Sequence, residues 1–269
     1  MVPHLLAREA QLDAAAERLL AAARSGVPCT PVRDLIGADD VQAAYAVQRR
    51  LTAIRVASGA RVVGRKIGLT SAAVQAQLGV DQPDFGVLFD DMEHHGGDVV
   101  PAGSVLQPRA EAEIAFVLGE DLAEGDLGAT RVRAAVDHAV AAIEICGSRI
   151  ADWDISFGDT VADNASAGVY VLGSRQVRLD QFTPKHVEMR MTVTGQDDST
   201  GNGEACLGDP LEALRWLALR ARELGDPLLA GQVVLSGALG PMRPVARGQR
   251  VRATLTGLGA VSFTYGEQS

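Results

Sequence analysis

Two acidic residues in an otherwise apolar stretch are the first sign of chemistry in this sequence. Glu111 and Glu113 belong to residues 107–118, which are typical of a β-strand from Glu111 onward, because Ala112, Ile114, Phe116 and Leu118 alternate with the residues between them. This alternation places both carboxylates on one face, roughly 7 Å apart. Ala115 and Val117 continue that face with apolar side chains, which favours a covered face over a solvated one. Two carboxylates on a covered face need a cation between them, because an unpaired buried charge is costly.

A third acid interrupts a second apolar run. Glu144 lies within residues 141–146, which we expect to form a short buried strand. Acids in neighbouring apolar strands are typical of a metal site with oxygen ligands. A salt bridge from Glu144 to Arg109 or Arg149 is the alternative, and the spacing does not choose between the two.

One lysine and two aspartates precede these strands. Lys66 lies in residues 61–69, a predicted strand, next to apolar side chains. Spacing alone favours a lysine that extends from a strand edge into solvent, and the alternative is a desolvated lysine that transfers a proton. Asp81 and Asp84 lie in residues 79–86, where Pro and Gly predict a loop with the aspartates as turn formers.

Helices and strands that would position these residues follow from periodicity and capping signals. We predict helices over residues 11–24, 40–59, 70–78, 130–140 and 209–225. We predict further strands over residues 169–172, 187–193, 232–235 and 250–265, with a glycine-rich turn at 236–242. Residues 148–168 form a long irregular segment, which in a compact domain is often functional. We interpret His94 and His95 as surface residues and His138, on the fourth helix, as structural.

Composition excludes several classes of protein. The 269 residues carry 34 acids against 25 bases, a net charge of −9, which argues against a nucleic-acid binder but not against small anionic substrates. Three scattered cysteines are typical of a reduced, cytoplasmic protein, and we find no signal peptide and no apolar run of membrane-spanning length. Phosphate-binding glycine loops and the serine-hydrolase elbow are also missing from the sequence.

Several motifs in order resemble one enzyme family. They are residues 64–71 (GRKIGLTS), 79–86 (GVDQPDFG), 108–113 (PRAEAE), 163–166 (DNAS) and 237–242 (GALGPM). This set resembles the 2-hydroxypenta-2,4-dienoate hydratases, also called 2-keto-4-pentenoate hydratases, of the fumarylacetoacetate hydrolase superfamily. The resemblance covers the chain from about Asp40 to Phe263.

The resemblance implies an α+β fold, in which a mixed β-sheet is rolled into a barrel-like sandwich with outer helices. We expect a helical N-terminal region at residues 1–60 and a catalytic domain at 61–269, together one compact unit. The resemblance also implies a homo-oligomer, a pentamer or decamer. Its implied metal is Mg²⁺ or Mn²⁺, held by Glu111, Glu113 and Glu144.

The implied reaction is a hydration. A 2-hydroxy-2,4-dienoate is protonated at C5 and then gains water at C4, which gives a 4-hydroxy-2-oxoalkanoate. By resemblance, Lys66 and Asp84 transfer protons and position water, in roles that the sequence does not divide between them. Ser166, Asn164 and Leu69 are expected to contact the substrate. A divalent cation would act as a Lewis acid on the C2 oxygen.

Three rival functions remain. A 2-oxo-3-hexenedioate (4-oxalocrotonate) decarboxylase of the same superfamily would carry Met after the lysine, where this chain has Ile67. A C–C bond hydrolase would need a histidine–acid pair, and no histidine lies in the matched motifs. A catalytically idle scaffold subunit is the third, and the retained glutamates and Lys66 argue against it.

Overall fold

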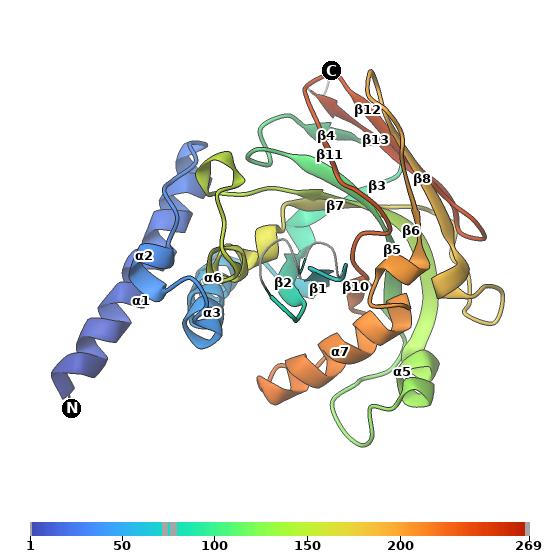
Figure 1. Ribbon diagram of the computed structural model, residues 1–269. Coiled ribbons are helices and arrows are strands. Elements are labelled where there is room, and N and C mark those ends of the chain that lie inside the picture. The colour runs from blue at the N-terminus through green and yellow to red at the C-terminus, as the bar shows by residue number, and fades with distance from the viewer. Residues whose placement is uncertain (1, 72–74, 76–79, 267–269) are drawn as a thin grey trace.

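Two β-sheets form the body of the protein, and helices lie against and beside them (Figure 1). The computed structural model describes residues 2–71, 75 and 80–266. The larger sheet has the order β2-β1-β10-β5-β6-β7-β3, and β11 pairs with β5 beside this path. The smaller sheet has the order β4-β13-β12-β8-β9. This is the α+β architecture with a curved mixed sheet that the family resemblance implied, so the predicted fold class is confirmed.

The strands of both sheets are short except for β5 and β6. Their bounds are β1 Val62–Gly68, β2 Asp84–Phe89, β3 Glu93–His95, β4 Val99–Pro101, β5 Arg109–Leu118, β6 Val136–Cys146, β7 Val169–Leu172, β8 Glu188–Val193, β9 Ser199–Asn202, β10 Val233–Leu235, β11 Arg243–Pro244, β12 Arg250–Leu255 and β13 Gly259–Gly266. The α-helices are α1 Val2–Ser25, α2 Arg33–Ile36, α3 Val41–Ala57, α5 Ala129–Ala135, α6 Phe157–Ala162 and α7 Pro210–Glu223.

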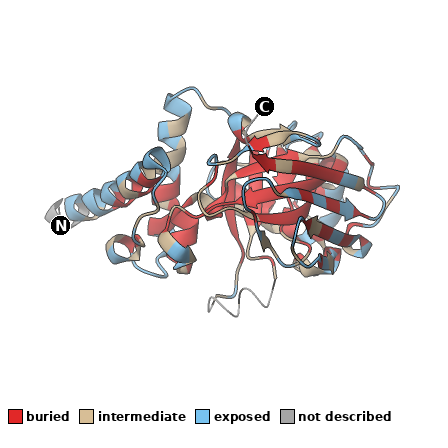
Figure 2. Ribbon diagram, turned by 90° about the horizontal axis from the view of Figure 1, so that it is seen from above, coloured by how far each residue is buried: buried red, intermediate tan, exposed pale blue. Residues whose placement is uncertain are grey.

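The first three helices stand to one side of the sheets, and the outer face of α1 is exposed (Figure 2). The predicted helix at 40–59 is confirmed as α3, and Asp40 caps it by accepting a hydrogen bond from the backbone N of Ala43. The helix predicted at 11–24 begins earlier, at Val2. Leu6, in the part of the helix before residue 11, is 65% exposed, so it does not continue the buried stripe on which the prediction was based.

Gln48 connects this helical region to the sheet. Its side-chain amide is buried and donates hydrogen bonds to the backbone oxygens of Phe85 in β2 (2.9 Å) and Val161 in α6 (3.0 Å). An amide buried with two partners holds α3 in one position, because losing either bond would leave a polar group unsatisfied. The helix thus supports β2 and α6, the two elements that flank the candidate site.

The helix predicted over residues 130–140 is confirmed only as far as Ala135, and the prediction for residues 136–140 was wrong. The helix α5 ends at Ala135, and the chain from Val136 onward forms β6, including His138. Residues 136–146 pair along most of their length with β5, so the long sheet ladder overrides a local pattern that fits a helix equally well. The strand predicted at 141–146 is therefore only the second half of β6.

Two further expectations about loops need correction. The loop predicted at 79–86 ends earlier, because Asp84 is the first residue of β2 rather than a turn former. The irregular segment at 148–168 contains the helix α6, which Ser156 and Asp159 cap reciprocally. The helix predicted at 70–78 lies mostly outside the described residues.

The remaining predicted elements are confirmed. Helix α7 begins at the Asp209 cap with Pro210 in its first turn, and β7, β8, β10, β12 and β13 match the predicted strands. His95 is exposed and His94 half-buried, on the short strand β3. Within the described residues, no helix is long and apolar enough to cross a membrane.

Candidate functional site

Strand register brings the candidate acids together on one face of the larger sheet. Glu111 of β5 lies directly opposite Glu144 of β6, and Glu113 follows on the same face. The same face continues across β10 to Lys66, since Leu235 pairs with both Ala115 and Lys66. Asp84 pairs with Gly68, two residues along β1 from Lys66. Four acids and one lysine from four strands therefore share a single surface.

All five of these side chains are buried, with exposed fractions between 0% for Glu113 and 8% for Glu111. The covered face that the sequence favoured is confirmed. Lys66 is buried, so the lysine extending into solvent that spacing alone favoured was wrong. Among the described residues, five buried side-chain polar atoms have no hydrogen-bond partner, and four belong to this cluster: Asp84 Oδ1, Glu113 Oε1, Glu144 Oε1 and Glu144 Oε2. Buried carboxylate oxygens without partners are rare, and one explanation is a bound cation.

Lys66 lies between the carboxylates and a loop. Its Nζ donates a hydrogen bond to the backbone oxygen of Ala165 at 3.0 Å. Nζ also lies 3.2 Å from Glu144 Oε2, which makes an ion pair although the two groups are not aligned for a hydrogen bond. The salt bridge considered for Glu144 thus forms with Lys66, whereas Arg149 pairs with Asp163 and Arg109 stacks on Trp153.

Asp84 is connected to Ser166 through a hydroxyl. Thr160 of α6 donates to Asp84 Oδ2 at 3.5 Å and lies 3.3 Å from the Ser166 hydroxyl. Both hydroxyls are buried, so they form a short polar chain that ends on the carboxylate. Sequence reasoning missed Thr160, because a single threonine in a short helix carries no chemical signal.

A strained turn presents Ala165 and Ser166 to this cluster. Asn164, Ala165 and Ser166 have φ values of 55°, 50° and 55°, so three consecutive residues other than glycine adopt the left-handed conformation. Each costs roughly 1–2 kcal/mol, and such strain concentrates at functional sites. The Asn164 side chain holds the turn by accepting from the backbone N of Val87 (2.8 Å) and donating to its O (2.9 Å).

Leu69 is another strained residue of the site. Its φ is 55°, and it directly follows the strand that carries Lys66. The side chain is half-buried, and the backbone oxygen accepts a hydrogen bond from Gln75 at 2.7 Å. The chain therefore turns sharply away from β1 immediately beyond Lys66.

Two glycines make room for the acids. A Cβ on Gly68 would lie 2.2 Å from Asp84 Oδ1, so only a residue without a side chain lets Asp84 occupy its position. Gly237 has φ of 101°, and its backbone N donates to Glu113 Oε2 at 2.7 Å. A Cβ at this position would lie 2.5 Å from Thr70 Oγ1. The glycine-rich turn therefore brings backbone close to the carboxylates.

Burial dominates the electrostatics of the cluster. It raises the pKa of Asp84 to about 6 and that of Glu111 to about 7, while Lys66 lowers both pKa values and Glu144 raises them further. Burial and the neighbouring glutamates raise the pKa of Glu113 well above its usual range. Burial lowers the pKa of Lys66, but Glu144 and the other acids raise it, and the net effect is a raised pKa. The ammonium is therefore charged at neutral pH.

The charge balance fits a divalent cation. If all four acids were ionised, Lys66 would compensate one of four negative charges, and three would stay unpaired in a buried site. A divalent ion would reduce that excess to one charge, and carboxylate oxygens are the ligands that Mg²⁺ and Mn²⁺ prefer. Glu111, Glu144 and Cys146 each offer one donor atom, and these atoms lie within 4.8 Å of one another. Glu113 is on the same face but outside that group.

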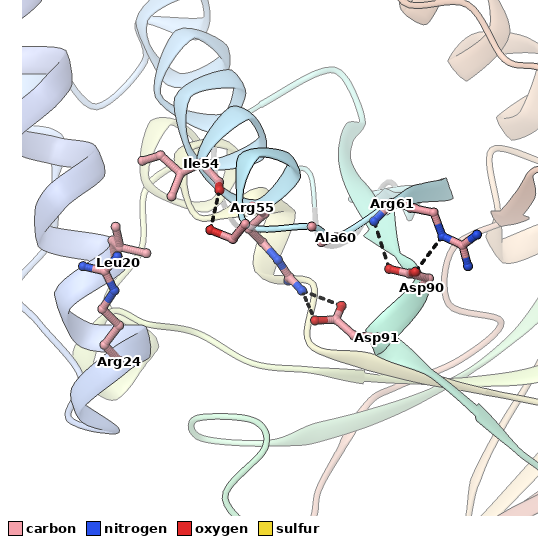
Figure 3. A pocket seen from close by; sticks show the side chains of 10 residues that line it. Leu20, Arg24, Ile54, Arg55, Ala60, Arg61, Asp90 and Asp91 are labelled. Atoms are coloured by element: carbon pink, nitrogen blue, oxygen red, sulfur yellow. Dashed lines mark hydrogen bonds and ion pairs between the residues drawn. The ribbon is translucent and has the colours of Figure 1, made fainter.

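Two cavities of the protein lie away from these acids. One, of about 630 Å³, lies between α1, the end of α3 and Asp90 and Asp91 (Figure 3). Both aspartates of its lining are engaged in ion pairs, Asp91 with Arg55 and Asp90 with Arg61. The other, of about 320 Å³, lies between α1 and the strained turn. Neither cavity is lined by the acids whose carboxylate oxygens lack a hydrogen-bond partner.

Comparison with known proteins connects this geometry to a family. The family model described as fumarylacetoacetate (FAA) hydrolase C-terminal matches residues 61–264. The chain is 52% identical over 259 residues to the TodF product hydratase of Pseudomonas putida. This match covers 96% of this chain and 97% of that protein. It is 51% identical to the 2-keto-4-pentenoate hydratase of Paraburkholderia xenovorans, over 93% of each chain.

A solved structure shows the same fold. The 4-oxalocrotonate decarboxylase from Pseudomonas putida G7, complexed with magnesium and adipate, superposes with a TM-score of 0.90. It is 31% identical, and the match covers 96% of this chain and 98% of that one. Identity is higher to the hydratases than to this decarboxylase, over a similar share of the chain. The chain therefore belongs to the 2-keto-4-pentenoate hydratase family, within the fumarylacetoacetate hydrolase superfamily.

Proposed function

We propose that this protein is a metal-dependent hydro-lyase that hydrates a 2-hydroxy-2,4-dienoate, such as 2-hydroxypenta-2,4-dienoate, to a 4-hydroxy-2-oxoalkanoate, as in the meta-cleavage degradation of aromatic compounds. The observation that carries the proposal is the cluster of four buried acids around one buried lysine, with four carboxylate oxygens unpartnered. About 50% identity over nearly the whole chain to hydratases supports the same reaction.

In this proposal Glu111, Glu113 and Glu144 hold a divalent cation, Mg²⁺ or Mn²⁺. The bound ion supplies Lewis acidity to the C2 oxygen of the substrate, where negative charge develops. Glu113 Oε1 and both oxygens of Glu144 support these assignments, because none of them accepts a hydrogen bond within the described residues. The backbone N–H of Gly237 holds Glu113 by its other oxygen.

Lys66 acts as the proton donor in the first step. Its pKa is raised, so the side chain is an ammonium at neutral pH and can protonate C5 of the dienol. The C2 hydroxyl gives its own proton to Lys66, which restores the ammonium, and the substrate becomes the 2-oxo-3-enoate. The hydrogen bond to Ala165 and the ion pair with Glu144 fix the direction of Nζ.

Asp84 acts as the base in the second step. Its pKa of about 6 leaves the carboxylate mostly ionised at neutral pH, yet basic enough to accept a proton from water that adds at C4. Asp84 then gives this proton to C3 and becomes a carboxylate again, so one water is added in total. Thr160 and Ser166 hold Asp84 and the water, Asn164 fixes the strained turn, and Leu69 contacts the substrate chain.

A side-by-side assay tests the reaction. Purified protein with Mg²⁺ is given 2-hydroxypenta-2,4-dienoate, and we expect the dienol absorbance to disappear without release of CO₂. The structural likeness to a decarboxylase makes 2-oxo-3-hexenedioate the second substrate to test. Release of CO₂ from it with a higher kcat/KM would contradict hydration as the main activity.

Assembly is a separate part of the proposal. By the family resemblance, the chain forms a homo-oligomer, a pentamer or decamer. Light scattering coupled to size-exclusion chromatography measures the mass directly. A monomer at micromolar concentration would contradict it.

A further inference from the structure

The thiol of Cys146 lies beside the proposed metal ligands, and the hydration described above gives it no task. Cys146 ends β6 two residues after Glu144, so both side chains are on the same face of the strand. One donor atom each from Cys146, Glu111 and Glu144 lie within 4.8 Å of one another. The cysteine is 3% exposed, so the protein shields this thiol from solvent.

The second observation concerns Glu144, which is aimed into the same space. It is 1% exposed, and neither of its carboxylate oxygens has a hydrogen-bond partner among the described residues. Glu113 differs, because Gly237 already engages one of its oxygens and it lies outside the 4.8 Å group. Two overlapping ligand sets therefore share Glu111 and Glu144: one is completed by the carboxylate of Glu113, the other by the thiol of Cys146.

These two sets suit different ions. Three carboxylates suit Mg²⁺ and Mn²⁺, which prefer oxygen ligands and do not recruit a thiol. Two carboxylates and a thiolate suit Zn²⁺ or Co²⁺, which bind sulfur strongly. Both sets supply three protein ligands, but Zn²⁺ favours tetrahedral coordination and Mg²⁺ octahedral coordination, so a zinc ion leaves fewer positions open to substrate or water.

We propose that Cys146 is an alternative metal ligand. Its thiolate does not bind Mg²⁺, but it joins Glu111 and Glu144 around a thiophilic divalent cation such as Zn²⁺ or Co²⁺. This inference rests on the metal site of the proposed function. When such an ion binds, the thiol proton passes to solvent and a metal–sulfur bond forms, with no change of oxidation state. Zinc is then held tightly and inhibits hydration until a chelator removes it.

Cobalt spectroscopy tests the metal–sulfur bond without an activity assay. The metal-free protein is titrated with Co²⁺, and we expect a near-ultraviolet sulfur-to-cobalt charge-transfer band at one equivalent. Cys146→Ser and Cys146→Ala should abolish the band, while Co²⁺ binding is still detected by calorimetry. Cys29→Ser is the matched control, because Cys29 is a half-buried cysteine that does not belong to the group of donor atoms around Cys146.

Affinities give an independent measurement. Competition with a chromophoric chelator should show that Cys146→Ser weakens Zn²⁺ binding by ~10-fold or more, with Mg²⁺ affinity changed by less than about 3-fold. Wild-type protein that binds Co²⁺ without a charge-transfer band would overturn the proposal, and this measurement needs no variant. A band that persists in Cys146→Ser would also overturn it. If the wild-type protein showed no Mg²⁺-dependent hydration, that result would instead contradict the proposed function.

Discussion

At the scale of single residues, Glu144 is the acid on which most depends. Neither of its buried oxygens accepts a hydrogen bond within the described residues, and Oε2 forms the ion pair with Lys66. We expect Glu144→Gln to lower kcat/KM for hydration by ~10³-fold or more, because an amide keeps the shape but removes the charge that holds the cation.

The control for this variant is Glu188→Gln, since Glu188 is exposed on β8. The turnover of Glu188→Gln should match that of the wild type. Metal content is measured on each purified variant together with activity. Near-normal hydration by Glu144→Gln with the metal verified absent would contradict the mechanism.

Thr160 gives a second prediction. Its hydroxyl donates to Asp84 and lowers the pKa of that carboxyl, so Thr160→Val should raise the pKa above its value of about 6. The acidic limb of the kcat profile would then move to higher pH, and a rise of about one unit would lower kcat at neutral pH by roughly 2-fold, because only about half of Asp84 would be ionised. Thr160→Ser keeps the hydroxyl and should restore the wild-type profile. An unchanged profile in Thr160→Val would show that the threonine only fills space.

Sequence reasoning at this scale found the charged groups and missed the neutral ones. Glu111, Glu113 and Glu144 stand out because acids are unusual in apolar strands, and the structure buries all three. Spacing alone favoured a solvent-exposed Lys66, and only the family resemblance pointed to the buried lysine that the structure shows. Thr160 and Cys146 could not be found, because their importance lies in contacts between segments distant in the sequence.

At the scale of elements, Gly68 shows how closely β1 and β2 must approach. An alanine there would place its Cβ 2.2 Å from Asp84 Oδ1 and 3.5 Å from Lys66 Nζ. We expect Gly68→Ala to displace Asp84 and lower kcat by ~10²-fold, as small misplacements of catalytic groups do.

Gly96→Ala is the matched control for that variant. The nearest atom to its new Cβ is the Leu172 backbone oxygen, at an ordinary contact distance of 3.5 Å. Both variants are followed by kinetics and by thermal unfolding. If Gly68→Ala loses no more activity than Gly96→Ala, then β2 does not fix Asp84 as tightly as the geometry indicates.

The elements themselves were predictable where local signals agree with the sheet. Helix α7 has a cap, a proline and an amphipathic stripe, and it was predicted nearly residue for residue. Residues 136–140 were predicted as helix because the spacing of their apolar residues fits a helix as well as a strand. Only the pairing with β5 makes them a strand. The left-handed turn at 164–166 could not be expected from its residue types, since Asn-Ala-Ser has no glycine.

At the scale of the whole molecule, the boundary at residue 60 stays a prediction. The family model begins at residue 61, after the first three helices, whereas the match to the TodF product hydratase covers 96% of this chain. Gln48 nevertheless bonds α3 to β2 and α6, so the helices support the site. We expect them to fold with the sheets as one compact unit rather than as an independent domain.

The buried acids also affect the stability of the whole molecule. Without metal, the folded-state pKa values of Asp84 (about 6) and Glu111 (about 7) are raised above those of the unfolded chain. A group of this kind contributes stability that is complete below its unfolded pKa and is lost as pH rises through the folded pKa. The metal-free protein should therefore lose stability between about pH 4 and pH 7 from these groups.

A bound divalent cation reverses this dependence, since it favours the ionised carboxylates that burial disfavours. We expect saturating Mg²⁺ to raise Tm more at about pH 8 than at about pH 5.5, by about 4 °C, which corresponds to roughly 2 kcal/mol. Each Tm is compared with that of the same protein in chelator at the same pH, so that titration elsewhere in the molecule cancels. Equal gains at the two pH values would mean that Mg²⁺ binds outside the buried cluster, because exposed carboxylates are ionised at both.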